Sequence, residues 1–381
     1  ARGAREGARS PQWNVPERTE AGQGEARRTE TARRKGRPQA GARPGKALAV
    51  SRKHLEEVGV RVPLLPTTTV GSFPKPPELL AARAQARRSE ISAEALDEKA
   101  REATAFWIKK QEELGLDILV DGEQYRGDMV AYFAEHFKGF KEGGLVRSYG
   151  NRYYHKPVIV SEVRWPGSFT VEWWKYAQSL TAKPVKGMLT GPYTIMDWSF
   201  NEHYPNRRAV AMAIARELRK EVEALIKAGC KVIQIDEPAL SVRPEELSTA
   251  IDSMRVVTEG LSAYFLTHVC YGAFEFIYPN MLKLPVENFD LEMSNSELDL
   301  LKLFSKAPFT KDISFGVFDV HTHKVDPPET IKRRIKKALE YLKPDQIWVD
   351  PDCGLKTRTV QEAVDQLASM QAAVNEVRRT L

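Results

Sequence analysis

One pattern constrains the fold of this chain more than any other feature of its sequence. A short apolar run, often rich in β-branched residues, ends in polar residues or glycine and is followed by a stretch with helical periodicity. The pattern occurs eight times, over residues 67–72, 117–123, 186–191, 232–237, 264–270, 289–294, 315–321 and 347–353. Strands that alternate with helices predict an α/β fold with a parallel sheet, and eight such units predict a closed (β/α)8 TIM barrel.

The connecting stretches support this prediction, because helical periodicity is clear over residues 207–228, 327–342 and 359–379. One insertion interrupts the alternation between the second and third runs. Residues 143–163 contain two strand-like pieces, around 147–154 and 158–162, which predict an inserted β-hairpin.

Charge is distributed unevenly along the chain. Residues 1–50 contain 12 Lys/Arg and 5 Asp/Glu, so they account for the net charge of +6 and leave residues 51–381 close to neutral. Trp13 is the one aromatic residue of this segment, which cannot bury enough apolar surface to fold. We expect a disordered basic tail over residues 1–50 and a single barrel domain over 51–381. A basic tail could bind nucleic acid, but we expect no nucleic-acid partner; deletion of residues 1–46 tests this.

Composition argues against membrane proteins and disulfide-rich secreted proteins. No run of about 18 apolar residues exists, so the sequence predicts no transmembrane helix. The three cysteines, Cys230, Cys270 and Cys353, are too few for a disulfide framework in 381 residues. A reducing, cytoplasmic location fits, and free thiols are then available as ligands or nucleophiles.

Polar side chains stand at the C-terminal end of nearly every run. A barrel places all of these ends on one face, around one mouth. Buried carboxylates and imidazoles are costly without partners or a task, so their recurrence predicts a shared site rather than separate helix caps. The ends are Val70-Gly71-Ser72, Asp121-Gly122-Glu123, Thr190-Gly191-Pro192, Asp236-Glu237-Pro238, His268-Val269-Cys270, Glu292-Met293-Ser294, Asp319-Val320-His321 and Asp350-Pro351-Asp352-Cys353-Gly354.

Four of these residues form a candidate metal site. His268 and Cys270 are two apart on one strand, so both side chains point the same way. Glu292 ends the sixth run and Cys353 the eighth. One imidazole, two thiolates and one carboxylate suit tetrahedral zinc, and two thiolates favour zinc over magnesium or calcium. Cys230 precedes a strand, where a buried structural thiol is common, and is assigned no role.

Zinc in such a site favours chemistry on a thiol. The thiolate is the reactive form of a thiol, and zinc deprotonates a thiol that it binds. An exchangeable carboxylate such as Glu292 could yield its place to a substrate thiol, which indicates thiol alkylation. Hydrolysis by zinc-bound water is the competing use of the same ligands.

Five segments match one known family in its order. They are LPTTTVGSFP (65–74), TAKPVKGMLTGPYTIMDW (181–198), QIDEPAL (234–240), HVCY (268–271) and PDCGLKTR (351–358). With these motifs the chain resembles the catalytic C-terminal barrel of cobalamin-independent methionine synthase, from about Leu64 to its C-terminus. The resemblance implies a zinc-dependent methyltransferase that methylates the thiol of homocysteine in methionine biosynthesis.

The resemblance also implies roles for individual residues. The family's zinc ligands fall on His268, Cys270, Glu292 and Cys353. Its homocysteine site falls on Val70, Gly71, Ser72, Glu123 and Asp236. In that site the two carboxylates would hold the amino group, and backbone donors near Ser72 would hold the carboxylate. His321 matches the family's proton donor, whereas Arg152, on the inserted hairpin, and Trp198 match positions that contact the pterin cofactor.

Two departures from the family concern the methyl donor. The family's large enzymes carry an N-terminal barrel that helps to bind the folate, whereas only the basic tail precedes the barrel here. Where those enzymes usually have Arg-Glu after Pro-Ala-Leu, this chain has Ser241-Val242, which removes an acidic group expected to bind the pterin. The chain resembles the short, single-barrel form, whose donor is methyltetrahydrofolate or a methylcorrinoid, including one carried on a corrinoid protein. We expect faster methylation of homocysteine from methylcobalamin than from methyltetrahydrofolate.

Two other enzyme classes share parts of this pattern. His321-Thr322-His323 matches the His-x-His motif of metal-dependent amidohydrolases, but that motif normally ends the first barrel strand, and here it ends the seventh. A relative that alkylates coenzyme M would keep the zinc ligands and lose Glu123 and Asp236, because its thiol substrate has no amino group. Both carboxylates are present here, which favours homocysteine.

Overall fold

The computed structural model describes residues 49–147, 153–270, 272 and 274–381. The tail predicted over residues 1–50 lies outside the described residues, except for its last two, which begin helix α1 (Ala49–Glu57). From α1 onward, the described residues belong to one structural unit.

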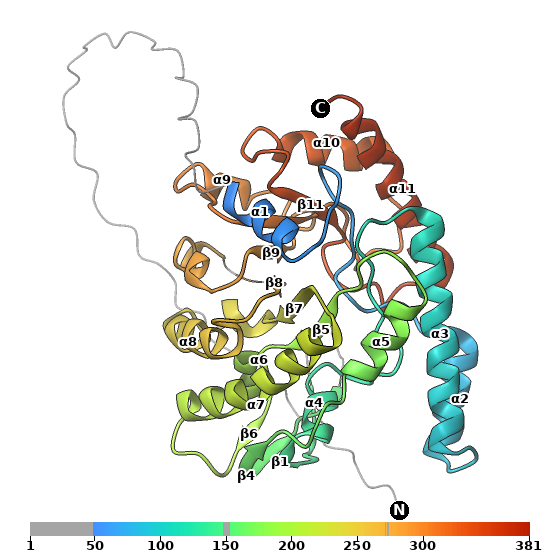
Figure 1. Cartoon of the computed structure of the whole chain (residues 1–381), viewed down its shortest axis with the longest axis vertical. Helices are drawn as coiled ribbons and strands as arrows, with labels where there is room; N and C mark the ends of the chain where they lie inside the picture. Colours follow the sequence, from blue (N-terminus) through green and yellow to red (C-terminus); the bar gives the residue numbers. More distant parts are fainter. Residues whose placement is uncertain (1–48, 148–152, 271, 273) are drawn as a thin grey trace, which may run out of the picture. The chain divides into compact units, whose positions relative to one another are not determined.

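Parallel strands form the centre of this unit (Figure 1). In the described part of the chain, six of them make a continuous sheet with the order β11, β10, β9, β8, β7 and β5. The strands are β5 (Gly187–Thr190), β7 (Val232–Asp236), β8 (Tyr264–Val269), β9 (Asn288–Leu291), β10 (Asp312–Gly316) and β11 (Ile347–Asp350). All of their residues are buried, as expected for parallel strands with helices on one side and packed side chains on the other.

The segments around Thr67 and Leu119 close this sheet into a ring. Thr67 forms a parallel bridge with Val349 of β11, and Leu119 forms one with Val185, which lies just before β5. Between the two segments, the backbone N–H of Ile118 donates to Thr67 O at 3.1 Å. The predicted TIM barrel is therefore confirmed, with these segments as its first and second positions.

The strands predicted over residues 67–72 and 117–123 are wrong in extent, because side chains replace ladder hydrogen bonds there. Thr67 N–H and Oγ1 both donate to Asp117 Oδ2, each at 2.8 Å. Gln111, from α3 (Ala93–Leu114), donates to Val120 O at 2.8 Å and accepts from Val120 N–H at 3.0 Å. Glu123, with a φ of 54°, then turns the chain away. Each segment consequently joins its neighbour through an isolated bridge rather than a strand.

The seventh strand lies earlier in the sequence than predicted. β10 covers Asp312–Gly316, whereas the apolar run suggested 315–321. The strand begins with a polar residue that has a buried partner: Asp312 Oδ2 accepts from the Tyr264 hydroxyl at 2.6 Å. Val317 and Phe318 are fully buried beyond the strand, so the apolar run continues after the ladder hydrogen bonds stop.

Helices surround the strands on the outside of the ring (Figure 1). The three helical stretches predicted from periodicity are confirmed as α7 (Arg207–Ala228), α10 (Pro328–Ala338) and α11 (Val360–Arg378). α7 begins after Asn206, whose side chain accepts from Ala209 N–H, and α11 begins after Thr359, in a capping box with Glu362. The other described α-helices are α2 (Pro77–Arg87), α4 (Ala131–His136), α5 (Val171–Ser179), α6 (Pro192–Asp197), α8 (Leu247–Thr258) and α9 (Leu301–Phe304).

The insertion after the second barrel position is larger than the predicted hairpin. An antiparallel hairpin is present, but it consists of β2 (Leu145–Arg147) and β3 (Tyr153–His155). β4 (Val158–Arg164) instead pairs with β1 (Lys138–Lys141) and β6 (Phe200–Asn201). The predicted pairing of 147–154 with 158–162 is therefore wrong. The first piece instead supplies residues to both strands of the observed hairpin, β2 and β3.

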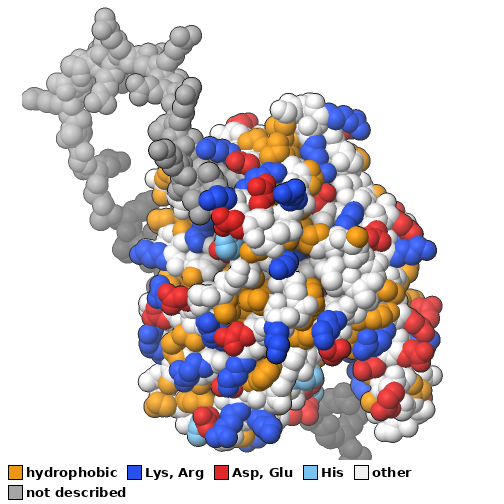
Figure 2. Space-filling view, viewed as in Figure 1, with side chains coloured by type: hydrophobic (Ala, Val, Ile, Leu, Met, Phe, Trp, Pro, Cys, Tyr) orange, Lys and Arg blue, Asp and Glu red, His pale blue; other side chains and the backbone are white. Residues whose placement is uncertain are grey.

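The surface of the described residues carries charges of both signs. Figure 2 shows basic and acidic side chains interspersed over one face of the molecule. This mixture agrees with the near neutrality of residues 51–381. Among the described helices, none is long and apolar enough to cross a membrane.

Candidate metal and substrate site

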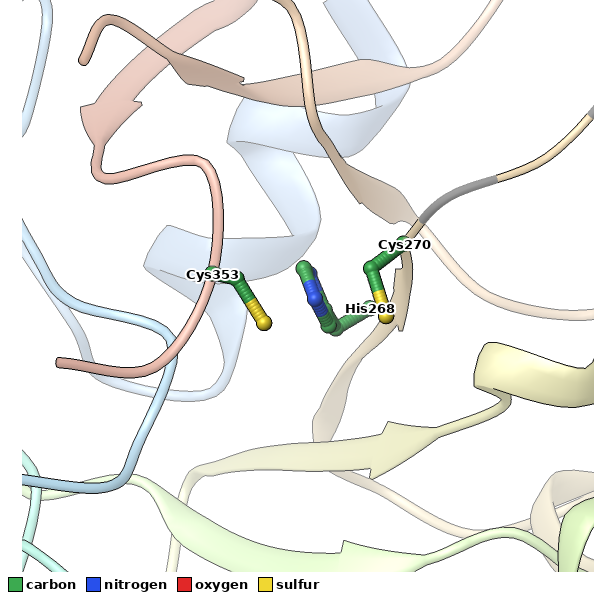
Figure 3. A group of neighbouring side chains, drawn as sticks. All are labelled: His268, Cys270 and Cys353. Atoms are coloured by element: carbon green, nitrogen blue, oxygen red, sulfur yellow. The ribbon is translucent and has the colours of Figure 1, made fainter. Parts of the chain in front are cut away.

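Three of the four predicted metal ligands lie together at the mouth of the barrel. His268 is on β8, Cys270 follows the end of β8, and Cys353 lies in the loop after β11. Their ligand atoms all lie within 4.8 Å of one another, and Figure 3 shows the three side chains converging from these two segments. Both cysteines are free, and neither residue is fully buried.

The imidazole of His268 is oriented so that one nitrogen is left for a metal. Its Nδ1 forms a 2.9 Å hydrogen bond with Asp290 Oδ1, on β9. Its Nε2 is buried and has no hydrogen-bond partner among the described residues. An unpaired buried nitrogen beside two thiols is costly, and a carboxylate on the other ring nitrogen is the usual support of a metal-bound histidine. The residues present therefore fit a tetrahedral metal such as zinc.

The two thiols of the cluster differ in acidity because they lie against each other. A hydrogen bond from Cys270 and the nearby imidazole of His268 hold the pKa of the Cys353 thiol well below its usual range. The contact with Cys353, together with burial, raises the pKa of the Cys270 thiol well above its usual range. Cys353 is thus the first of the pair to ionise, and thiols bind metals in the ionised form.

Glu292, the fourth predicted ligand, lies beside the cluster rather than among its converging ligand atoms. It follows the end of β9 and is buried, and burial raises the pKa of its carboxyl group. Asp352 fixes its loop, because the carboxylate accepts from the backbone N–H groups of Met293 at 3.1 Å and Ser294 at 3.0 Å. The loop that carries Glu292 is thereby tied to the loop that carries Cys353.

The predicted substrate residues Gly71, Ser72 and Glu123 lie close together, because the backbone segments that carry them are tightly packed. A Cβ atom on Gly71 would lie 2.8 Å from Met188 Cε and 3.3 Å from Glu123 Oε1, so a side chain here would crowd that carboxylate. A Cβ atom on Gly354 would fall 2.1 Å from Ser72 Oγ. Ser72 therefore lies directly against the loop of the metal cysteine.

Asp236 reaches this region from the end of β7. Gln234 Nε2 donates to Asp236 Oδ1 at 2.8 Å and to Val70 O at 2.7 Å, which joins two predicted substrate residues. Burial raises the pKa of Asp236 to about 7, although His268 and the hydrogen bond from Gln234 oppose the shift. Among the described residues Asp236 has no ion-pair partner, so it can accept an ammonium group.

Glu123 is already engaged in an ion pair. Arg126 Nη1 lies 3.1 Å from Glu123 Oε1, and both side chains are largely buried. Any ammonium group that binds Glu123 would share its carboxylate with this guanidinium.

The remaining predicted residues do not belong to the metal cluster. His321 is exposed in the loop after β10, where its backbone N–H donates to Asp319 Oδ1 at 2.7 Å. Trp198 is half-buried at the C-terminal end of α6 and packs against the main core. Arg152 lies outside the described residues.

Asp290 and Lys186 contribute to the site and were not predicted from the sequence, whereas Asp352 was named among the polar strand ends without a role of its own. Asp290 could have been found, because it lies two residues before Glu292 on one strand and so shares its face. The contacts of Asp352 with the β9 loop, and of Lys186 with Gln234, join distant segments. No local pattern reveals such contacts.

A sequence comparison decides which family this arrangement belongs to. The profile of the family described as "Cobalamin-independent synthase, Catalytic domain" matches residues 65–376. The chain belongs to this family. The match runs from the first barrel segment into α11 and includes every residue of the metal cluster.

Two curated relatives of this chain are each about twice as long as the chain itself. A Nitrosomonas europaea protein named 5-methyltetrahydropteroyltriglutamate–homocysteine methyltransferase is 41% identical over 343 residues, which cover 87% of this chain and 45% of that protein. A Neisseria meningitidis protein of the same name is 39% identical over 373 residues, which cover 95% and 49%. The chain spans about half the length of these relatives.

Two solved structures show the same barrel. A B12-independent methionine synthase from Shewanella sp. W3-18-1, in complex with selenomethionine, is similar with a TM-score of 0.74 and 27% identity, over 83% of this chain and 98% of that one. A methyltransferase from Methanosarcina mazei is similar with a TM-score of 0.58 and 16% identity, over 86% and 98%. At that lower identity the likeness supports the fold alone.

Proposed function

We propose that this chain is a zinc-dependent homocysteine S-methyltransferase that forms methionine. One observation carries the proposal: the His268, Cys270 and Cys353 cluster lies beside Asp236, a buried carboxylate with no ion-pair partner among the described residues. The two regions adjoin, because Glu237 N–H, next to Asp236, donates to His268 O at 2.9 Å. Homocysteine carries a thiol and an ammonium group on one short chain, so it can engage both regions.

Zinc is the proposed metal, and His268, Cys270 and Cys353 would hold it with Glu292 as the fourth ligand. When bound, zinc would keep the substrate thiol in its reactive thiolate form. Asp290 would keep His268 in the tautomer whose Nε2 faces the metal position.

The residues of the substrate side would hold the amino-acid end of homocysteine. Asp236 and Glu123 would accept hydrogen bonds from the ammonium group, and backbone donors near Ser72 would bind the carboxylate. Val70 and Gly71 would line the wall between them. The close contact of Gly71 with the Glu123 carboxylate explains why a side chain at this position would block the approach.

Methyl transfer requires one bond to form and one to break. The homocysteine sulfur attacks the methyl carbon, the bond between that carbon and the donor breaks, and its electron pair stays on the donor. A folate donor would keep the pair on a ring nitrogen, which must then take up a proton. His321, on the exposed loop after β10, is the proposed source of that proton, and Trp198 and Arg152 are the proposed pterin contacts.

For the donor, we propose a methyltetrahydropteroyl oligoglutamate, because relatives named for this substrate are 39–41% identical to the chain. Methylcobalamin or another methylcorrinoid is the alternative, because the exposed Val242 stands where an acidic pterin contact was expected. The sequence-based expectation of a faster reaction from methylcobalamin stays a prediction that opposes this choice, and the relative rates with the two donors decide between them.

The proposal is tested by measuring methyl transfer from methyltetrahydropteroyltriglutamate and from methylcobalamin, each with homocysteine and with coenzyme M as acceptor. We expect homocysteine to be the preferred thiol with either donor, because only homocysteine carries the amino group that Asp236 can bind. Equal or faster methylation of coenzyme M would contradict the proposal. The ratio of the two homocysteine rates identifies the donor.

A further inference from the structure

Lys186 is the only buried lysine in the described part of the chain, with 1% of its surface exposed. It lies immediately before β5 and points among the other buried polar groups of the barrel. A buried ammonium group costs several kcal/mol unless the surroundings compensate for it, and an apolar residue of similar size would pack at lower cost. Packing alone therefore does not explain why a lysine occupies this position.

The contacts of Lys186 are with neutral oxygen atoms. Its Nζ donates to Thr69 O at 2.7 Å and to Gln234 Oε1 at 2.5 Å. Among the described residues, no carboxylate forms an ion pair with it. Burial lowers the pKa of Lys186, and the opposing charges are those of Asp290, Asp350, Asp236 and Glu123. These four carboxylates together therefore compensate the positive charge of the Lys186 ammonium group, although none of them forms an ion pair with it.

Lys186 decides how the amide of Gln234 is oriented. An ammonium group can only donate, so it must face Oε1 of the amide. The amide nitrogen then faces the opposite way, where it donates to Val70 O at 2.7 Å and to Asp236 Oδ1 at 2.8 Å. A flipped amide would bring Nε2 against the ammonium group and Oε1 against two acceptors. Every partner of Gln234 therefore supports the same orientation.

We propose that Lys186 is a positioning residue for the amino-acid end of the substrate: acting through Gln234, it fixes Asp236 and the Val70 segment where the ammonium group binds. The identity of that substrate rests on the proposed function. Lys186 hydrogen-bonds none of the three clustered metal ligands, so its hydrogen bonds act on the ammonium side of the site.

The test uses Lys186→Met and Gln234→Met, which keep side-chain length and remove the hydrogen bonds, with the exposed Lys175→Met as matched control. Zinc-loaded full-length protein is titrated with homocysteine and with 4-sulfanylbutanoate, which lacks only the amino group. We expect each variant to lower the preference for homocysteine over 4-sulfanylbutanoate by about tenfold, the effect of one lost hydrogen bond at a charged group. Zinc content and 4-sulfanylbutanoate affinity should match those of wild type and Lys175→Met.

The double variant separates positioning from a merely structural role. If Lys186 acts through Gln234, Lys186→Met should add almost nothing in the Gln234→Met background. An unchanged preference in Lys186→Met, equal losses for both thiols, or additive effects would overturn the proposal. If Lys186→Met does not fold, the preference measured in Gln234→Met decides. A wild-type protein with no preference for homocysteine would refute the proposed substrate itself, and this inference with it.

Discussion

At the scale of single residues, Asp290 would support the proposed metal site without binding the metal itself. Asp290 Oδ1 forms a 2.9 Å hydrogen bond with His268 Nδ1, which leaves His268 Nε2 directed at the two thiols. Behind it lies Asp350, whose pKa is raised well above its usual range by burial and by the charge of Asp290. A carboxylate hydrogen-bonded to the second ring nitrogen fixes the tautomer of a histidine and strengthens it as a metal ligand.

Asp290→Asn should therefore weaken zinc binding by about 10–100-fold, the usual effect of losing a carboxylate partner of a metal-bound histidine. Zinc affinity is measured by competition with a chelator of known affinity. Asp312→Asn is the control, because this buried carboxylate binds the Tyr264 hydroxyl at the opposite end of the strands. Equal zinc affinity in Asp290→Asn and wild type would show that His268 needs no such support.

The pKa of Asp236 predicts how substrate preference depends on pH. Burial raises this pKa to about 7, so the carboxyl group is neutral below that pH and ionised above it. The ammonium group of homocysteine stays charged throughout this range. We therefore expect the preference for homocysteine over 4-sulfanylbutanoate to be present above about pH 7 and to be lost as the pH falls.

Comparing the two thiols reduces the contribution of thiol ionisation, because both compounds bind the metal position through the same group. Asp236→Asn should lose the preference at every pH, by about 1.5–3 kcal/mol at pH 8, the value of a hydrogen bond to a charged group. A preference that stays constant from pH 5.5 to 8.5, or that survives in Asp236→Asn, would remove Asp236 from the ammonium site.

His321 can be tested by comparing donors. His321→Asn should slow transfer from methyltetrahydropteroyltriglutamate by about 10²–10⁴-fold, because the departing nitrogen needs a proton. Transfer from methylcobalamin should change much less, because a corrinoid is a better leaving group. Single-turnover rates with both donors provide the measurement. Equal slowing with both would argue against a role as proton donor.

At the scale of elements, the first two barrel positions are held by side chains where the other six use strands. Gln111 illustrates this, because one buried amide satisfies both the N–H and the C=O of Val120. Gln111→Met keeps the volume but leaves both backbone groups unpaired. We expect the free energy of unfolding to fall by about 2–4 kcal/mol in denaturant titrations. The exposed Gln361→Met should change it by less than about 0.5 kcal/mol, and a similarly small effect of Gln111→Met would contradict this account.

These elements also show what the sequence could predict. The barrel and its strand order could be predicted from apolar runs with polar ends. Parallel strands are buried on both faces, so they appear in a sequence as nearly continuous apolar runs. The extent of the first two strands was wrong, because contacts such as Thr67 with Asp117 depend on residues 50 positions apart. The pairing of β4 with β1 and β6 was missed for a related reason, since short strands in an insertion carry no signal for their partners.

At the scale of the whole molecule, the barrel explains why the site was largely predictable. His268, Cys270 and Cys353 converge because parallel strands present their C-terminal ends at one mouth. Residues that act across the barrel escaped prediction, because Lys186 and Gln234 have no unusual spacing and look like ordinary polar residues in the sequence. The structure thus adds supporting residues, such as Lys186 and Gln234, to the ligands that the sequence already suggested.

The most direct test of the account is the dependence of methionine formation on zinc. Protein freed of metal by a chelator is titrated with zinc, and the rate of homocysteine methylation is followed with the better donor. We expect activity to rise from zero and to saturate at about one zinc per chain. Cys270→Ala and Cys353→Ala should lose both zinc and activity, whereas Cys230→Ala, which changes a buried thiol outside the cluster, should keep both. Full activity without zinc, or in Cys353→Ala, would contradict the central claim.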